Sequence, residues 1–196
     1  MYISRLTARN WKNFTGVDVA LHDMVYLVGP NASGKSNFLD IFRFLRDIVN
    51  PSGGGLQKAM SSRGGFKKVR SLAARRFSDV ELSVELKENL DVPEPTWEYH
   101  LSFQGDSSNK QRVRIVSEKV FQNGEQILQR PNKEDRQDPE RMTATFLEQV
   151  NANKDFRQVA NCFDEVLYLH LVPQLLKFGN QLAVQRMESD PFGPQG

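Results

Sequence analysis

Apolar and polar residues alternate along several short stretches of the chain, and this two-residue period predicts β-strands. Residues 2–8 and 17–21 alternate on either side of the polar sequence NWKNFTG, which suggests a hairpin-like pair. Later alternating stretches predict four more strands, at residues 79–86, 96–103, 112–121 and 125–130. The last two strands are joined by a turn at QNGE. The short connections predict an antiparallel sheet.

Two neighbouring stretches show different periods. The apolar run MVYLVG, residues 24–29, is continuous, which predicts a strand that is buried on both faces. From Lys35 to Val49 the apolar residues recur at helical spacing, so we expect a buried helix that ends at NPSGGG.

The remaining segments carry weaker patterns. Residues 56–76 are predicted to be loop-like, with a short helix near 56–62. Residues 131–141 are polar and are predicted to be mobile. Helices are predicted again at residues 143–150 and 154–166.

The bulk composition is that of an ordinary globular chain, and the length suits one large domain or one and a half small ones. The 196 residues are 39% apolar and 26% charged, and the net charge of +2 excludes a global basic field. A single cysteine, Cys162, excludes a disulfide framework and indicates a reducing compartment. No apolar run approaches the roughly 18 residues that a membrane span needs, and no signal peptide is visible. We therefore expect a cytoplasmic protein with no membrane contact.

The sequence GPNASGKS, residues 29–36, has the Walker A spacing and stands between the predicted strand and the predicted helix. Glycine lets such a loop curl its N–H groups toward phosphate oxygens, and the helix N-terminus adds further donors. Lys35 is expected on the β- and γ-phosphates, and Ser36 on Mg²⁺. The predicted ATP-phosphate residues are Gly29, Pro30, Asn31, Ala32, Ser33, Gly34, Lys35, Ser36 and Asn37.

Two downstream stretches are similar to other ATPase motifs, but local structure explains them better. SGGGLQKA, residues 52–59, resembles an L-S-G-G-Q signature but follows Walker A too closely, so we interpret it as a helix-terminating loop. VANCFDE resembles a Walker B strand, yet Asn161 interrupts it and the preceding residues have helical spacing. Asp164 and Glu165 are therefore interpreted as residues of a solvated helix. No catalytic residue is assigned, because no other carboxylate suits Mg²⁺ binding or water activation.

The N-terminal strand, NWKNF and LVGPNASGKSNFLDI together resemble the head domains of the RecF/SMC/OLD-like branch of ATP-binding cassette ATPases. The motif resemblance is tight over residues 1–65 and looser over 66–180. It implies an α/β P-loop fold of an ABC-type head lobe, with a mixed sheet around the Walker A helix, an antiparallel β-subdomain and C-terminal helices. It also implies that two heads form a homodimer that sandwiches ATP and Mg²⁺.

The same resemblance suggests how the chain is organised. Residues 1–180 would be the N-terminal part of a head, and residues 181–196 a tail or truncation point. Within the head we expect the Walker A strand-loop-helix, the basic loop, the antiparallel strands and a mainly helical part at residues 1–50, 51–78, 79–130 and 143–180, respectively.

In such relatives the signature motif and Walker B lie in a C-terminal half. We therefore expect the C-terminal half of the same protein to be a partner of these residues. ATP hydrolysis is then expected of the full-length protein, and little or none of these residues alone. The Q-loop glutamine stays unassigned among Gln104, Gln122 and Gln174.

By match to the relatives' N-terminal turn, Lys12 and Asn13 are further candidates for contact with the ATP phosphates. A purely structural interpretation stays open beside this one. In that interpretation the turn is solvated, and Trp11 and Phe14 pack into the core.

A local excess of positive charge lies between Asp47 and Asp79, where no acidic residue occurs. The basic residues are Lys58, Arg63, Lys67, Lys68, Arg70, Arg75 and Arg76. Two interpretations stay open. In the first, the segment contacts a nucleic-acid backbone, ATP or the opposing head. In the second, it is a solvated basic loop or one that is paired with acidic residues elsewhere.

The sequence supports two functions. A third, a small P-loop kinase, has the least support. The first is the ATP-binding N-terminal half of an ABC-type ATPase that dimerises around ATP. The resemblance links such a protein to DNA, through repair, recombination or anti-phage defence. The second is a nucleotide-gated binding module that assembles with a partner effector without significant turnover.

Overall fold

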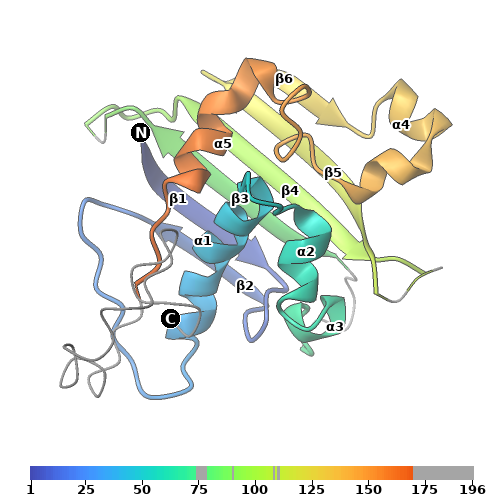
Figure 1. Ribbon diagram of the computed structural model, residues 1–196. Coiled ribbons are helices and arrows are strands. Elements are labelled where there is room, and N and C mark those ends of the chain that lie inside the picture. Colours follow the sequence, from blue (N-terminus) through green and yellow to red (C-terminus); the bar gives the residue numbers. More distant parts are fainter. Residues whose placement is uncertain (74–78, 90, 108, 110, 170–196) are drawn as a thin grey trace, which may run out of the picture. The chain divides into compact units, whose positions relative to one another are not determined.

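The computed structural model describes residues 1–73, 79–89, 91–107, 109 and 111–169. Contacts within the chain divide it into two units, Met1–Glu165 and Val166–Gly196. The described residues of the second unit, 166–169, lie outside any helix or strand. All helices and strands that are described below belong to the first unit (Figure 1).

One sheet of six antiparallel strands, in the order β2-β1-β3-β4-β5-β6, forms the frame of the first unit. The strands are β1 (Tyr2–Arg9), β2 (Gly16–Ala20), β3 (Val80–Lys87), β4 (Trp97–Gly105), β5 (Val113–Gln122) and β6 (Glu125–Arg130). Every strand that alternation predicted is therefore present. The predicted turn between β5 and β6 is also confirmed, because Asn123 and Gly124 have φ angles of 50° and 79°, as a tight hairpin requires.

The helices are short except for the first one. They are α1 (Lys35–Val49), α2 (Leu56–Ser61), α3 (Phe66–Val69), α4 (Lys133–Gln137) and α5 (Arg157–Asp164), with 3₁₀ turns η1 (Pro139–Thr143) and η2 (Lys154–Phe156). In Figure 1, α1, α2 and α5 lie across one face of the sheet. The short helix near 56–62 and the helix that ends at Asp164 match the predictions.

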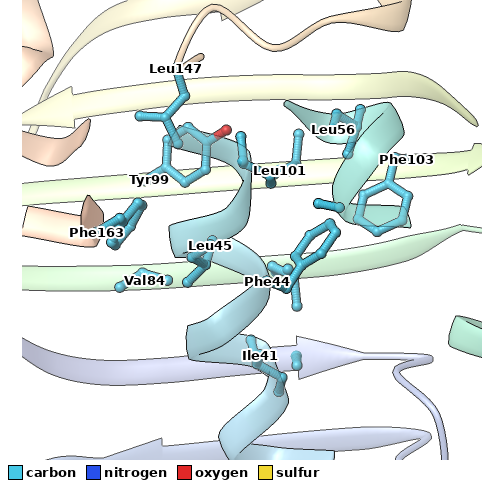
Figure 2. Packing of buried hydrophobic residues seen from close by; sticks show 14 of the residues in the cluster. Ile41, Phe44, Leu45, Leu56, Val84, Tyr99, Leu101, Phe103, Leu147 and Phe163 are labelled. Carbon is cyan, nitrogen blue, oxygen red and sulfur yellow. The ribbon is translucent and has the colours of Figure 1, made fainter. Parts of the chain in front are cut away.

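The core lies between α1 and the sheet. Phe44 and Leu45 of α1 are fully buried, as are Tyr99 and Leu101 of β4, and Figure 2 shows these side chains gathered between the helix and the strands. The Phe44 ring lies 5.6 Å from that of Phe103. The helical and the alternating patterns therefore meet at one apolar layer, which holds α1 and the loop before it in place.

Two predictions about the sheet are wrong for the described residues. Residues 24–29 form no strand, and their side chains are exposed, with Tyr26 at 79% and Val28 at 93%. A strand that is buried on both faces needs neighbouring strands and a cover on each face. No described strand pairs with this run, and the sheet is wholly antiparallel instead of mixed.

The polar segment 131–141 is not mobile but folded, as α4 and η1. Arg130, which is fully buried, uses all of its N–H groups there: it donates to the carboxylates of Glu118 and Asp135 and to the carbonyl oxygens of Ala144 and Arg141. A buried cation that is fully paired can order a polar segment that has few apolar residues of its own.

The helix that was predicted at residues 143–150 is also absent. Glu118, which is fully buried as well, accepts hydrogen bonds from the backbone N–H groups of Phe146 and Leu147 and from the hydroxyl of Tyr99. Because the carboxylate draws these N–H groups toward β5, residues 144–150 follow turns instead of a helix.

Candidate nucleotide-binding site

The loop of residues 29–34 curls back on itself immediately before α1. Ala32 and Gly34 have φ angles of 64° and 103°, both in the left-handed region. The Lys35 Nζ donates to the carbonyl oxygens of Gly29, at 2.7 Å, and Pro30, at 2.8 Å. The lysine therefore reaches across the loop and brings a positive charge to it.

The N-terminus of α1 opens directly onto this loop. Gly34 is its N-cap, and among the described residues no side chain caps the helix and no acidic residue occupies its first turn. The first N–H groups of an uncapped helix carry partial positive charge and favour an anion. Ser36, in that first turn, is exposed, so its hydroxyl is accessible from solvent.

The turn of residues 10–14 packs against the same loop. A Cβ at Gly34 would collide with Asn13 Nδ2 and would lie 2.9 Å from Phe14 Cζ. Asn13 also accepts a hydrogen bond of 2.8 Å from the side-chain amide of Asn37, in the first turn of α1. The structure thus places Asn13 against the loop, and the contact of Asn13 with ATP phosphates stays a prediction.

Trp11 fixes this turn to α1. Its side chain is fully buried, its Nε1 donates to the carbonyl oxygen of Asn37 at 3.0 Å, and its ring lies 5.0 Å from the ring of Phe44. Asn10 and Lys12 on either side have positive φ angles, 58° and 48°, which non-glycine residues adopt only when their surroundings hold them there.

Lys12 points to a different partner from Asn13. Its Nζ lies 2.7 Å from Asp40 Oδ2, in the second turn of α1. Arg63 Nη2 lies 3.0 Å from the other oxygen of Asp40, and Arg63 Nη1 lies 2.8 Å from Asp47. Burial raises the pKa of the Asp40 carboxyl, but Arg63 and Lys12 outweigh this effect, so that its pKa is below the usual value.

The structure separates the basic residues of the predicted loop. Arg63 has a side chain that is only 6% exposed and is committed to the two aspartates of α1. Lys58, Lys67 and Lys68 are exposed, while Arg70 is half-buried beside Trp11, with which it forms an isolated bridge. Arg75 and Arg76 lie outside the described residues, as does Gln174 among the Q-loop candidates; Gln104 lies on β4 and Gln122 ends β5.

Sequence reasoning missed Asp40 and Asp47 as the partners of Arg63. A signal was present, because residues seven apart lie two turns along one face of a helix. That face carries two negative charges directly before a segment that has only positive ones.

The glycine-rich stretch SGGGLQKA is a junction between helices, in agreement with its structural interpretation. Gly55 has a φ angle of 109°, and the carboxylate of Glu148 accepts a hydrogen bond of 2.8 Å from the N–H of Leu56. The Gln57 side chain clamps β5 to η1 through the carbonyl oxygens of Val113 and Thr143.

The second similar stretch, VANCFDE, is helical as predicted. Asp164 is the last residue of α5 and Glu165 follows it, and both are exposed. Across the described ranges, no group of three or more histidine, cysteine, aspartate or glutamate side chains could hold a metal ion.

The fold is that of an α/β protein. The junction between the loop and the uncapped N-terminus of α1 is suited to accept an anion. Residues 24–159 match the family model described as "AAA domain, putative AbiEii toxin, Type IV TA system". The match covers more than half of the chain, and the chain belongs to this family of AAA-type, ATPase-like domains, a class that binds nucleotide. No curated protein matches the chain.

None of the helices that the structure describes is long and apolar enough to cross a membrane. The cytoplasmic location stays a prediction.

Proposed function

We propose that residues 29–37 are a Walker A loop that binds MgATP, and that the chain is the corresponding part of an ABC-type ATPase of the RecF/SMC/OLD-like branch. The observation that carries this proposal is the position of Lys35, whose amine spans the curled loop at the uncapped end of α1. Cationic and N–H donors converge there on one small region, as phosphate binding requires.

Each part of the loop has a role in this proposal. The backbone N–H groups of residues 31–36 surround the phosphates, and the Lys35 amine leaves its carbonyl partners to bind the β- and γ-phosphates. The hydroxyl of Ser36 binds Mg²⁺. The side chain of Asn13, already against Gly34 and Asn37, borders the same space.

Hydrolysis needs more than this loop supplies. It requires a carboxylate beside Mg²⁺ and a group that orients the attacking water, and the 196 residues contain no motif for either one. We propose that a further polypeptide supplies them, either a C-terminal half or a second head that dimerises around ATP. On this proposal the 196 residues bind ATP and turn it over slowly.

The test is MgATP binding by the chain with Lys35→Ala, which should abolish measurable affinity. Lys87→Ala is a matched control, because Lys87 also donates to two carbonyl oxygens, those of Val92 and Pro93, at 2.7 and 2.8 Å on the far end of β3. Equal affinity of the Lys35→Ala variant and the wild type would overturn the Walker A assignment.

The alternative is a nucleotide-gated module that assembles with a partner effector. The exposed apolar run of residues 24–28, directly before the loop, favours assembly, because such a run is stabilised when another chain or segment covers it. Turnover separates the two functions. An ATPase hydrolyses ATP once the further polypeptide is present, whereas a module of this kind binds its partner in an ATP-dependent manner with little hydrolysis.

For the link to DNA, through repair or anti-phage defence, the exposed residues Lys58, Lys67 and Lys68 are the proposed contacts, together with Arg75 and Arg76. Replacing Lys67 and Lys68 by Glu should weaken duplex binding and reduce the log–log salt slope by about 2. Lys133→Glu, at an exposed position in α4, is the control. An unchanged slope favours the solvated-loop interpretation.

A further inference from the structure

Lys12 and Asn13 are adjacent in the chain but contact α1 at different places. We infer that Lys12 is a positioning residue: by pairing with Asp40, it holds the turn of residues 10–14 so that Asn13 faces the nucleotide. Asn13, and not Lys12, is then the residue of this turn that contacts the phosphate loop. The inference rests on the proposed nucleotide function of residues 29–37.

The contacts of the turn follow the geometry of the helix. Asn37 and Asp40 are three residues apart and therefore lie on one face of α1, one turn from each other. Asn13 contacts the first of them, with a hydrogen bond of 2.8 Å, and Lys12 contacts the second, at 2.7 Å. Two neighbouring side chains of the turn thus contact successive turns of α1. The contact of Asn13 is the one nearer the loop of residues 29–34.

Backbone hydrogen bonds restrict the conformation of Lys12. Its left-handed φ angle of 48° is held from both sides, because Lys12 donates its N–H to Val69 and Phe14 donates its N–H to Trp11. Buried Trp11 anchors the start of the turn, and the pair of Lys12 with Asp40 anchors the part that leads to Asn13. The pair of Lys12 with Asp40 is also partly shielded, with side chains that are 25% and 16% exposed, so solvent screens it less than a surface pair.

Arg63 explains why Asp40 stays in place. It binds Asp40 and Asp47 together from the segment after α2, and its guanidinium lies 5.2 Å from the centre of the Phe44 ring. Asp40 therefore joins three parts of the chain: the turn, α1 and the basic segment. When the Lys12 side chain is replaced, Asp40 still pairs with Arg63, so α1 stays bound to the basic segment. The turn, however, loses its ion pair with the second turn of α1.

A direct contact between Lys12 and phosphate makes the opposite prediction for Asp40. If Lys12 bound phosphate, neutralising Asp40 would free the amine and remove a nearby negative charge, so that the affinity for ATP would rise. If Lys12 acts through Asp40, neutralising either residue loosens the turn, so that the affinity falls. The sign of the Asp40→Asn effect therefore distinguishes the two roles.

The experiment measures MgATP affinity for the full chain with Lys12→Met, Asp40→Asn and both changes together. Each single change should weaken binding by about three- to tenfold. The double variant should bind no more weakly than the single variant with the lower affinity, because the pair acts as one unit. Lys12→Arg should restore binding, since the guanidinium also reaches the carboxylate. Arg5→Met, which breaks an exposed pair with Asp18, is the control and should leave the affinity unchanged.

A second cycle tests whether Lys12 acts through Asn13. Asn13→Ala alone should weaken binding, and adding Lys12→Met to it should cost nothing more, whereas a general structural defect would weaken binding again. Tighter binding by Asp40→Asn, or additive losses in either cycle, would overturn the positioning role. If the wild type binds no MgATP, the proposed function itself fails. If the wild type binds, Lys35→Ala abolishes binding and Lys12→Met leaves the affinity unchanged, Lys12 has no role and only this inference fails.

Discussion

Two arginines in this protein have the same kind of surroundings, and their differences show which part of the molecule is architecture and which part belongs to the site. Arg130 pairs with Glu118 and Asp135 and lies 3.9 Å from the centre of the Phe146 ring. Arg63 pairs with Asp40 and Asp47 and lies 5.2 Å from the centre of the Phe44 ring. Each arginine joins segments that are distant from one another along the chain.

The two clusters differ in how completely they are closed. Arg130 and both of its carboxylates are fully buried, and the guanidinium donates in five directions. At Arg63, the Nη2 is near Asp40 but makes no well-aligned hydrogen bond, and Asp40 and Asp47 are 16% and 23% exposed. A saturated buried cluster has one arrangement, while a partly solvated one tolerates adjustment. The adjustable cluster stands beside the proposed nucleotide site.

Arg130→Met should give the largest effect. It leaves Glu118 and Asp135 buried without a cation, so the free energy of unfolding should fall by about 3–5 kcal/mol. Urea denaturation measures this loss. Arg5→Met, in an exposed pair, should cost at most about 1 kcal/mol. A loss for Arg130→Met as small as that of Arg5→Met would show that the cluster is not what orders residues 131–147.

Arg63→Met should be less costly, about 1–3 kcal/mol, although the side chain is nearly as buried. Asp40 keeps Lys12, at 2.7 Å, and Asp47 keeps Arg46, at 3.4 Å, so neither carboxylate is left without a cation. The same denaturation experiment measures this change. If Arg63→Met destabilised the protein as much as Arg130→Met, the distinction between a closed and an adjustable cluster would be wrong.

Gly34→Ala sharpens the comparison at the loop itself. The left-handed backbone of Gly34 costs a residue with a Cβ about 1–2 kcal/mol, and the new methyl group would displace Asn13. We expect a modest loss of stability together with a marked loss of MgATP affinity. Gly124→Ala is a control with positive φ and open space around the position. Unchanged affinity in Gly34→Ala would show that Asn13 does not border the phosphate site.

Acid should produce the smallest effect. The pKa of Asp40 is lowered in the folded state, so its contribution to stability is present above its unfolded value of about 3.8 and is lost as pH falls through the folded pKa. Because Lys12 supplies part of this lowering, Lys12→Met should lose less stability than the wild type between pH 6 and pH 3. Denaturation midpoints at both pH values test this, and equal losses would argue against the pair.

Much of the fold could be predicted from the sequence, because strands that have one buried face alternate and an amphipathic helix repeats at its own period. β3, with Val80 and Val84 buried, and α1, with Phe44 and Leu45 buried, follow this rule. The run MVYLVG has no such face, so its pattern indicated burial but not the neighbours that burial requires. The segment around Asn132 was misread for the opposite reason, since its order comes from the single buried cation Arg130.

The sequence by itself determined the spacing of residues 29–36, the six alternating strands and the membership of an AAA-type, ATPase-like family. These features are local, and each is written in a few consecutive residues. Only the tertiary structure decided that Lys12 pairs with Asp40 while Asn13 contacts Asn37 beside the loop. It also decided that the side chain of Arg63, in the basic segment, pairs with Asp40 of α1. Pairing between charges depends on distances through space. Lys12 and Arg63 each reach Asp40 across more than twenty positions of the sequence, so a local pattern could indicate the charges but not which of them meet.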